Sequence, residues 1–171
     1  AKVFGAKHVF AIDLDEKKVE IAKQVGLVDA ICGKSEDVNV VIHEKTKGTG
    51  IDVAFEASGS PQAFCQAISL IRTSGRMGLV GRPVKSLEIP VNSFEKILRA
   101  QITLKGTWSF EFTEFPHHAW KKSLDALACG QIKTEPIISH RFPLEKTYDA
   151  IKIMSEHTEP FYKILMKPEM K

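Results

Sequence analysis

An aspartate, Asp13, comes directly after a strand-like apolar run, Val9 to Ile12, near the beginning of this 171-residue chain. A carboxylate at the tip of a strand can accept hydrogen bonds from the hydroxyls of a ribose. In βαβ units that bind nucleotides, such an acid stands about 20 residues after a glycine fingerprint. Only twelve residues precede Asp13, so the fingerprint does not fit ahead of it. We therefore expect a sheet that lacks its first strand and its glycine-rich loop.

Further candidate binding residues stand where other predicted strands end, or one turn into the helix after Asp13. Ligands of open parallel sheets bind outside the carboxyl ends of the strands, where helix N-termini and free backbone amides converge. Glycines at such ends let the backbone pass close to a flat ligand, because they carry no Cβ. The candidates are Lys18, Ser58, Gly59, Val80, Gly81, Arg82, Thr107 and Ser109.

Each candidate also has a simpler interpretation. Asp13 would serve equally as a cap for the following helix, and Lys18 as an ordinary exposed helical lysine. Plain turns would explain the glycines, and Arg82 is either a contact for a ligand phosphate or a surface arginine.

The elements that must position these residues alternate between strand-like and helix-like runs, which predicts a parallel sheet with crossover helices. Asp15 is placed to cap one helix, and Ser60 with Pro61 to begin another. That second helix is expected to include Ile71 and to end at Gly75. The predicted strands are 9–12, 30–32, 51–55, 77–80 and 101–105, and the predicted helices are 1–4, 15–25, 38–45, 60–71, 94–99 and 116–129.

The last forty residues have a different rhythm, with prolines at intervals and one helix, 144–155, between two short strands near 137–138 and 164–165. We predict two parts: a partial dinucleotide-binding domain over residues 1–131, and a return segment over 132–171. The expected class is α/β, a Rossmann-type doubly wound parallel sheet.

Composition narrows the function classes. With 43% hydrophobic and 26% charged residues, the chain can bury a core, and no apolar run reaches the length needed to cross a bilayer. The net charge of +3 is spread without a basic block, so we expect neither a nucleic-acid nor a membrane partner. Three distant cysteines, Cys32, Cys65 and Cys129, fit neither a disulfide framework nor a zinc site. A cytoplasmic location is expected.

Four stretches together resemble the coenzyme-binding half of zinc-dependent medium-chain alcohol and polyol dehydrogenases. They are AKVFGAKHVFAIDLDEKKVEIAKQVG, GIDVAFEASG, GRMGLVGRP and LRAQITLKGTWSF, and the resemblance covers nearly the whole chain. Within the superfamily, ILRAQITLKGTWSF and PIISHRFPLEK are most similar to bacterial galactitol-1-phosphate dehydrogenases and sorbitol dehydrogenase relatives.

The resemblance implies NAD-linked oxidation of a secondary alcohol of a polyol or polyol phosphate, such as galactitol 1-phosphate. It also implies an enzyme that is a homodimer or homotetramer, paired through strand 101–105. By position, Asp13 matches the ribose-binding acid and Lys18 the lysine beside it. The segment 80–82 matches backbone beneath the nicotinamide, and Thr107 with Ser109 matches backbone at its carboxamide. An acid at Asp13 would repel the additional phosphate of NADP, so NAD is the expected coenzyme.

The departures from the family are equally informative. Its zinc ligands and its glycine fingerprint do not occur here, so the resemblance places zinc in a longer parent protein and assigns no catalytic or metal residue to this chain. The chain alone is expected to be inactive and to bind coenzyme weakly. Two alternatives stay open: a zinc-free quinone or enoyl reductase of the same superfamily, and a non-catalytic nucleotide-binding or dimerisation module.

Other residues with possible chemistry have competing interpretations. His117 and His118 are either metal ligands or a solvated pair, and adjacent helical positions face different directions, which favours the second. His140 is a candidate for proximity to substrate. An aromatic group, defined as Trp108, Phe110, Phe112 and Phe115, favours packing at an interface over stacking on substrate.

Overall fold

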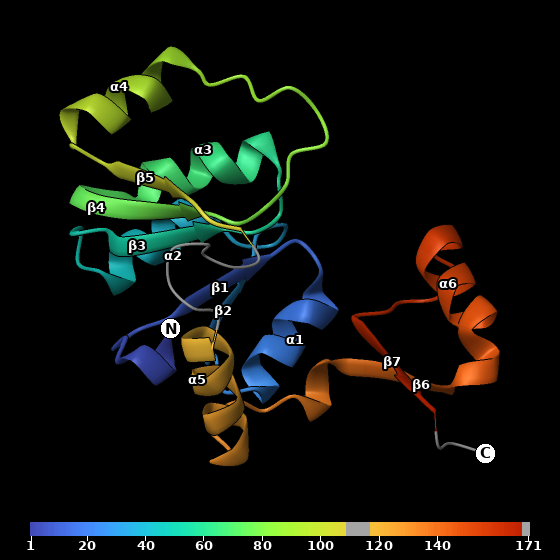
Figure 1. Cartoon of the computed structure of the whole chain (residues 1–171). Helices are drawn as coiled ribbons and strands as arrows, with labels where there is room; N and C mark the ends of the chain where they lie inside the picture. Colours follow the sequence, from blue (N-terminus) through green and yellow to red (C-terminus); the bar gives the residue numbers. More distant parts are fainter. Residues whose placement is uncertain (109–116, 169–171) are drawn as a thin grey trace. The chain divides into compact units, whose positions relative to one another are not determined.

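The computed structural model describes residues 1–108 and 117–168, and it divides into two compact units (Figure 1). The first unit contains Ala1–Cys32 and the described residues from Lys121 onward, and the second lies between Gly33 and Trp120. All strand pairs that the structure describes are parallel, which confirms the predicted α/β class.

The first unit begins with a βαβ arrangement and ends with a second pair of strands. Its elements are η1 (Lys2–Phe4), β1 (Phe10–Asp13), α1 (Glu16–Gln24), β2 (Asp29–Cys32), α5 (His117–Ala128, entering this unit at Lys121), η2 (Glu135–Ile137), β6 (Ile138–Pro143), η3 (Leu144–Lys146), α6 (Thr147–Glu156) and β7 (Lys163–Lys167). β1 pairs with β2, with Phe10 opposite Asp29 and Asp13 opposite Cys32. β6 pairs with β7 in a separate two-stranded sheet.

Helix α1 begins where the sequence predicts. The Asp15 side chain accepts a hydrogen bond from the Lys17 amide at 2.9 Å, satisfying a donor that would otherwise be unpaired in the first turn. Val19 of this helix is buried, as is Ile31 of β2. The cap and the apolar spacing therefore place α1 directly after the tip of β1.

The second unit is a three-stranded parallel sheet in the order β3-β4-β5, with helices between the strands. Its elements are α2 (Val38–Lys45), β3 (Ile51–Glu56), α3 (Pro61–Leu70), β4 (Ile71–Leu79), α4 (Val91–Arg99) and β5 (Thr103–Gly106). Figure 1 shows α3 and α4 on the same side of this sheet. The Ser60 side chain caps α3 and Pro61 occupies its first turn, as predicted.

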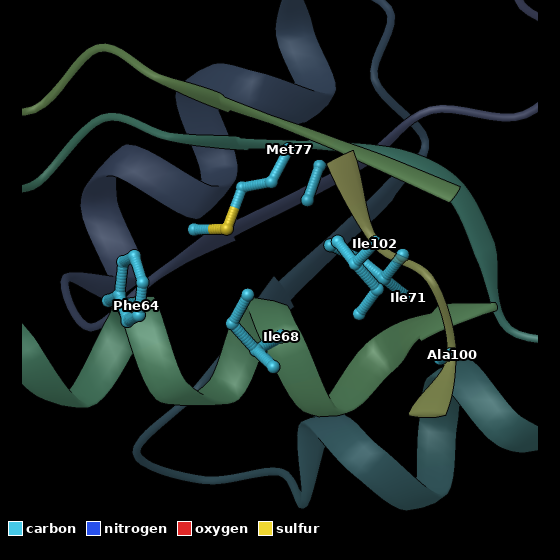
Figure 2. Close-up of a cluster of buried hydrophobic side chains, with 7 residues drawn as sticks. Phe64, Ile68, Ile71, Met77, Ala100 and Ile102 are labelled. Atoms are coloured by element: carbon cyan, nitrogen blue, oxygen red, sulfur yellow. The ribbon is translucent and has the colours of Figure 1, made fainter. Parts of the chain in front are cut away.

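The core of the second unit lies between α3 and the sheet. Phe64 and Ile68 of α3 pack with Ile71 and Met77 of β4, and Ile68 is 0% exposed (Figure 2). Ala54, Ala100 and Ile102 complete this cluster. The apolar spacing of α3 buries one helical face on the sheet, which fixes the strand ends that follow it.

Two adjoining predicted boundaries are wrong, the end of helix 60–71 and the start of strand 77–80. The helix ends at Leu70, Ile71 begins β4, and Gly75 lies inside that strand instead of ending a helix. Ile71 pairs with Ile51 and is 1% exposed, so burial in the sheet decides its conformation over helical spacing. The β3–β4 register shifts between Ile51 and Val53, and Ser74 takes a positive φ of 57°.

The three sheets are separate in hydrogen bonding: β1-β2, β3-β4-β5 and β6-β7. Within the described residues, β1 therefore has one neighbouring strand, β2. In the same residues no helix is both long and apolar enough to cross a membrane.

Candidate functional site

The Asp13 carboxylate stands at the end of β1, held by the turn into α1. Its Oδ1 accepts a hydrogen bond from the Asp15 amide at 2.9 Å, and its Oδ2 lies 3.7 Å from Lys18 Nζ. The side chains of Lys18 and Asp13 are 49% and 41% exposed. The carboxylate is thus oriented by the backbone, has a cation beside it, and is still open to a ligand.

Within the first unit, a groove of about 920 Å³ lies beside the end of β1, and Asp15 and Lys18 are part of its lining. Ile21 and Ala22 of α1 line it together with the segment from His157 to Tyr162. Burial raises the pKa of Tyr162 above its ordinary value, and the carboxylates of Asp15 and then Asp13 raise it further. The phenol therefore keeps its proton to a higher pH than an ordinary tyrosine does.

Sequence reasoning missed Tyr162 and the groove. Tyr162 comes just before β7, far along the chain from Asp13, and no motif or spacing links the two positions. Only the tertiary arrangement of the first unit brings the phenol within electrostatic range of the two carboxylates.

In the second unit, the predicted residues after β3 are organised by Glu56. Its Oε1 accepts hydrogen bonds from the Ser58 amide at 2.7 Å, the Ser58 hydroxyl at 2.6 Å and the Gly59 amide at 2.9 Å. The Glu56 backbone carbonyl also accepts from the Val80 and Gly81 amides, at 2.9 and 2.8 Å. This one residue therefore contacts the segments that follow both β3 and β4.

At Gly59 and Gly81, neighbouring atoms of the protein itself leave no space for a side chain. Gly59 has a φ of +73°, and a Cβ there would lie 2.7 Å from the carbonyl carbon of Arg82. A Cβ on Gly81 would lie 2.5 Å from Glu56 Oε2 and closer still to the Gly59 amide nitrogen. The two segments therefore interlock, and a contact between these glycines and a coenzyme stays a prediction.

The remaining predicted residue of the second unit, Thr107, follows β5. Its amide and its hydroxyl both donate to the Leu79 carbonyl at 3.0 Å, which ties the end of β5 to the end of β4. Val80 is 51% exposed, and Arg82 and Thr107 are also exposed. The fold thus gathers six predicted residues at the carboxyl ends of three adjacent strands: Ser58, Gly59, Val80, Gly81, Arg82 and Thr107.

The other candidates divide by where they fall. Ser109 lies outside the described residues, as do Phe110, Phe112 and Phe115 of the aromatic group, while Trp108 is 74% exposed. The pair His117 and His118 begins helix α5.

His140 is part of a polar network at the β6–β7 pair. Its Nδ1 lies 2.8 Å from the Ser139 hydroxyl and its Nε2 lies 3.5 Å from a Glu159 carboxylate oxygen. The Ser139 hydroxyl oxygen also accepts from the Tyr162 amide at 3.0 Å. These contacts link the start of β6 to the segment 159–162 that precedes β7, and the proximity of His140 to substrate stays a prediction.

Throughout the part of the chain that the structure describes, no three His, Cys, Asp or Glu side chains gather in a way that could hold a metal ion. The polar groups of the predicted site residues are instead carboxylates, which accept hydrogen bonds, and a lysine and backbone amides, which donate them. This set suits hydrogen bonding to hydroxyl and amide groups of an organic ligand better than it suits zinc.

Comparison of the sequence with known proteins identifies relatives of this chain. Residues 1–128 match the family model described as zinc-binding dehydrogenase. The chain is 32% identical over 155 residues to the L-threonine 3-dehydrogenase of Salmonella gallinarum, covering 89% of the chain and 43% of the relative. It is 29% identical over 168 residues to the sorbitol dehydrogenase of Bacillus subtilis, covering 98% of the chain and 45% of the relative.

Among solved structures, the chain is similar to galactitol-1-phosphate dehydrogenase from Escherichia coli, with a TM-score of 0.85 and 26% identity over 96% of this chain and 47% of that one. This similarity confirms the Rossmann-type fold. The chain spans less than half the length of these three relatives.

Proposed function

The chain belongs to the zinc-binding dehydrogenase family, and from this membership we propose that it is the coenzyme-binding part of an NAD-dependent oxidoreductase that oxidises a secondary alcohol. The observation that carries the proposal is the Asp13 carboxylate, which is oriented by the Asp15 amide and still 41% exposed at a strand's carboxyl end. Such a carboxylate can accept hydrogen bonds from both hydroxyls of the adenosine ribose.

Charge at this position supports NAD over NADP. The 2′-phosphate of NADP would approach the Asp13 carboxylate, and like charges at such range repel. Lys18 lies 3.7 Å from Asp13 and already compensates part of its charge, so it is suited to a ribose hydroxyl more than to a phosphate.

The strand ends of the second unit are proposed to hold the nicotinamide half of the coenzyme. Exposed backbone at 80–82 would run beneath the ring, with Thr107 and Ser109 at its carboxamide and Ser58 with Gly59 beside them. Support comes from the tie between the ends of β4 and β5, in which Thr107 donates to the Leu79 carbonyl. This gives the exposed segment a fixed position on which to orient a planar ring.

The chemistry of the whole protein would come from two bound groups: NAD accepts the hydride, and a zinc ion polarises the alcohol hydroxyl. We assign no residue of this chain to zinc. The contribution of this chain is to bind and orient the coenzyme.

Polyols and polyol phosphates are the proposed substrates, because the relatives include proteins named sorbitol dehydrogenase and galactitol-1-phosphate dehydrogenase. We further propose a cytoplasmic homodimer or homotetramer paired through β5. In the described residues β5 has one neighbouring strand, β4, and its four residues are exposed, which leaves an edge for pairing. Residues 1–131 are proposed as the coenzyme domain and 132–171 as the return segment.

Fluorescence titration with NADH and NADPH tests the proposal. We expect NADH to bind the 171-residue chain weakly, with a Kd of about 0.1 to 1 mM or higher, because the expected glycine-rich phosphate loop is not in the sequence. NADPH should bind more weakly still. Asp13→Asn should weaken NADH binding and reduce the preference for NADH over NADPH.

Glu20→Gln is the matched control. Glu20 is an exposed carboxylate on α1 of the same unit, paired with Lys23 at 2.7 Å, so its loss removes the same charge away from the strand end. The control should bind both nucleotides as the unmodified chain does. Tighter binding of NADPH than NADH, or an Asp13→Asn variant with unchanged preference, would contradict the proposal.

A further inference from the structure

Glu56 is the one charged residue that is buried in the part of the chain that the structure describes, and it is 6% exposed. Taking a carboxylate out of water is unfavourable unless hydrogen bonds replace the lost hydration. Glu56 is buried at the end of β3, beside a proposed ligand site. Its burial therefore needs a physical explanation.

The contacts of the carboxylate supply that reason. Oε1 accepts from the Ser58 amide, the Ser58 hydroxyl and the Gly59 amide, and Oε2 lies 3.1 Å from the same Gly59 amide. Every one of these partners is a donor. The arrangement suits a carboxylate, whose two oxygens both accept, better than an amide, whose NH2 group at the Oε2 position would face the donating Gly59 amide.

The same residue reaches the neighbouring segment by its backbone. The Glu56 carbonyl accepts from the amides of Val80 and Gly81, and Oε2 occupies the space that a Cβ on Gly81 would need. Side chain and backbone together thus fix the segment 57–60 against the segment 80–82. We call this set of contacts the Glu56 latch.

We propose that Glu56 is a positioning residue whose carboxylate and backbone carbonyl hold these two segments together and so shape the surface on which the coenzyme lies. The role in coenzyme positioning rests on the proposed function, whereas the latch itself is a property of the second unit. Glu56 does not touch the ligand in this proposal, because its oxygens are buried and already engaged.

Glu56→Gln is the direct test, since it keeps the shape and removes the charge. Amide hydrogen exchange at Ser58 and Gly59 should become at least about 10-fold faster, because these two amides donate to the carboxylate that the substitution replaces. Exchange at the core residue Met77 should stay slow. NADH affinity should fall by about 10-fold while the urea midpoint of the chain changes little.

Asp52→Asn is the matched control, because Asp52 lies near the opposite end of the same strand and its side chain is 76% exposed. It should leave both exchange and NADH affinity unchanged. If exchange at the Ser58 and Gly59 amides of Glu56→Gln stays within about twofold of the unmodified chain, the latch is refuted. If exchange rises while NADH affinity is unchanged, the positioning role is refuted.

A second pair of variants keeps the test decisive if Glu56→Gln does not fold. Ser58→Ala removes the hydroxyl that donates to Glu56 at 2.6 Å, and should speed exchange at Ser58 and Gly59, whereas Ser58→Thr keeps a hydroxyl and should restore protection. Equal exchange in the two variants would refute the latch. Should the unmodified chain bind no NADH, the proposed function fails, and the exchange data still decide whether Glu56 holds the segments.

Discussion

Gly81→Ala should destabilise the second unit and disturb the two interlocked segments. A Cβ at this position would lie 2.5 Å from Glu56 Oε2 and 2.9 Å from the Ala57 carbonyl carbon. Optimal separations between non-bonded heavy atoms are about 3.5 to 4.0 Å, so each contact is short by roughly 1 Å. The Ala57 atom belongs to the backbone, and Glu56 is fixed by its hydrogen bonds, so neither neighbour can move without losing contacts.

Inserting a methyl group into such a site costs about 1 to 3 kcal/mol, and immobile neighbours place this case toward the upper end. With a urea dependence of about 1 to 3 kcal/mol per molar, the unfolding midpoint followed by circular dichroism should fall by about 1 M. Gly106→Ala is the control, since no atom lies within 4 Å of a Cβ built there and the residue has no positive φ. Equal midpoints for the two variants would refute the packing argument.

Three further predictions concern other parts of the chain. In a Tyr148→Phe background, absorbance at 295 nm reports Tyr162 alone, and its phenol should lose its proton above the pH usual for tyrosine; Asp15→Asn should move this titration downward. Because the folded pKa is raised, the stabilisation from Tyr162 is present below the unfolded pKa and should disappear as the pH rises through the folded value, in urea titrations. Ile68→Ala removes a side chain that is 0% exposed and should lower the free energy of unfolding by about 2 to 5 kcal/mol, measured by urea denaturation. Asp37→Ala removes the cap of α2, whose side chain accepts from two amides at 2.9 and 3.3 Å, and should cost about 0.5 to 2 kcal/mol in the same assay.

Helix starts were predictable because capping is local. Asp15 caps α1 and Ser60 caps α3 by hydrogen bonds to amides two or three residues ahead, a range that the sequence displays directly. The end of α3 was not predictable in this way. Ile71 fits the apolar spacing of a helix, and only its pairing with Ile51 and its burial in the sheet assign it to β4.

Long-range features of the candidate site were outside the reach of sequence patterns. Tyr162 comes within electrostatic range of Asp15 and Asp13 through the packing of the first unit, without any fixed spacing along the chain. The sequence places glycines 59 and 81 at strand ends, and their close approach to a flat ligand stays a prediction, but the sequence does not show that their two segments interlock. In the structure each glycine makes room for the other segment.

The clearest limit of sequence reasoning is that two strands end in an acid, β1 in Asp13 and β3 in Glu56, and the sequence pattern does not distinguish them. Their surroundings differ because the following residues differ. After Asp13, the Asp15 amide engages one oxygen and the other remains open beside Lys18. After Glu56, a longer side chain folds back onto the donors of Ser58 and Gly59 and is buried by them. The first acid keeps unused capacity to accept hydrogen bonds from a ligand, whereas the second has spent its capacity on the protein. The hydrogen-bond donors in the next few residues should therefore indicate whether an acid at the end of such a strand binds a ligand or holds the protein's own backbone. Exchanging the two local sequences should exchange the two roles.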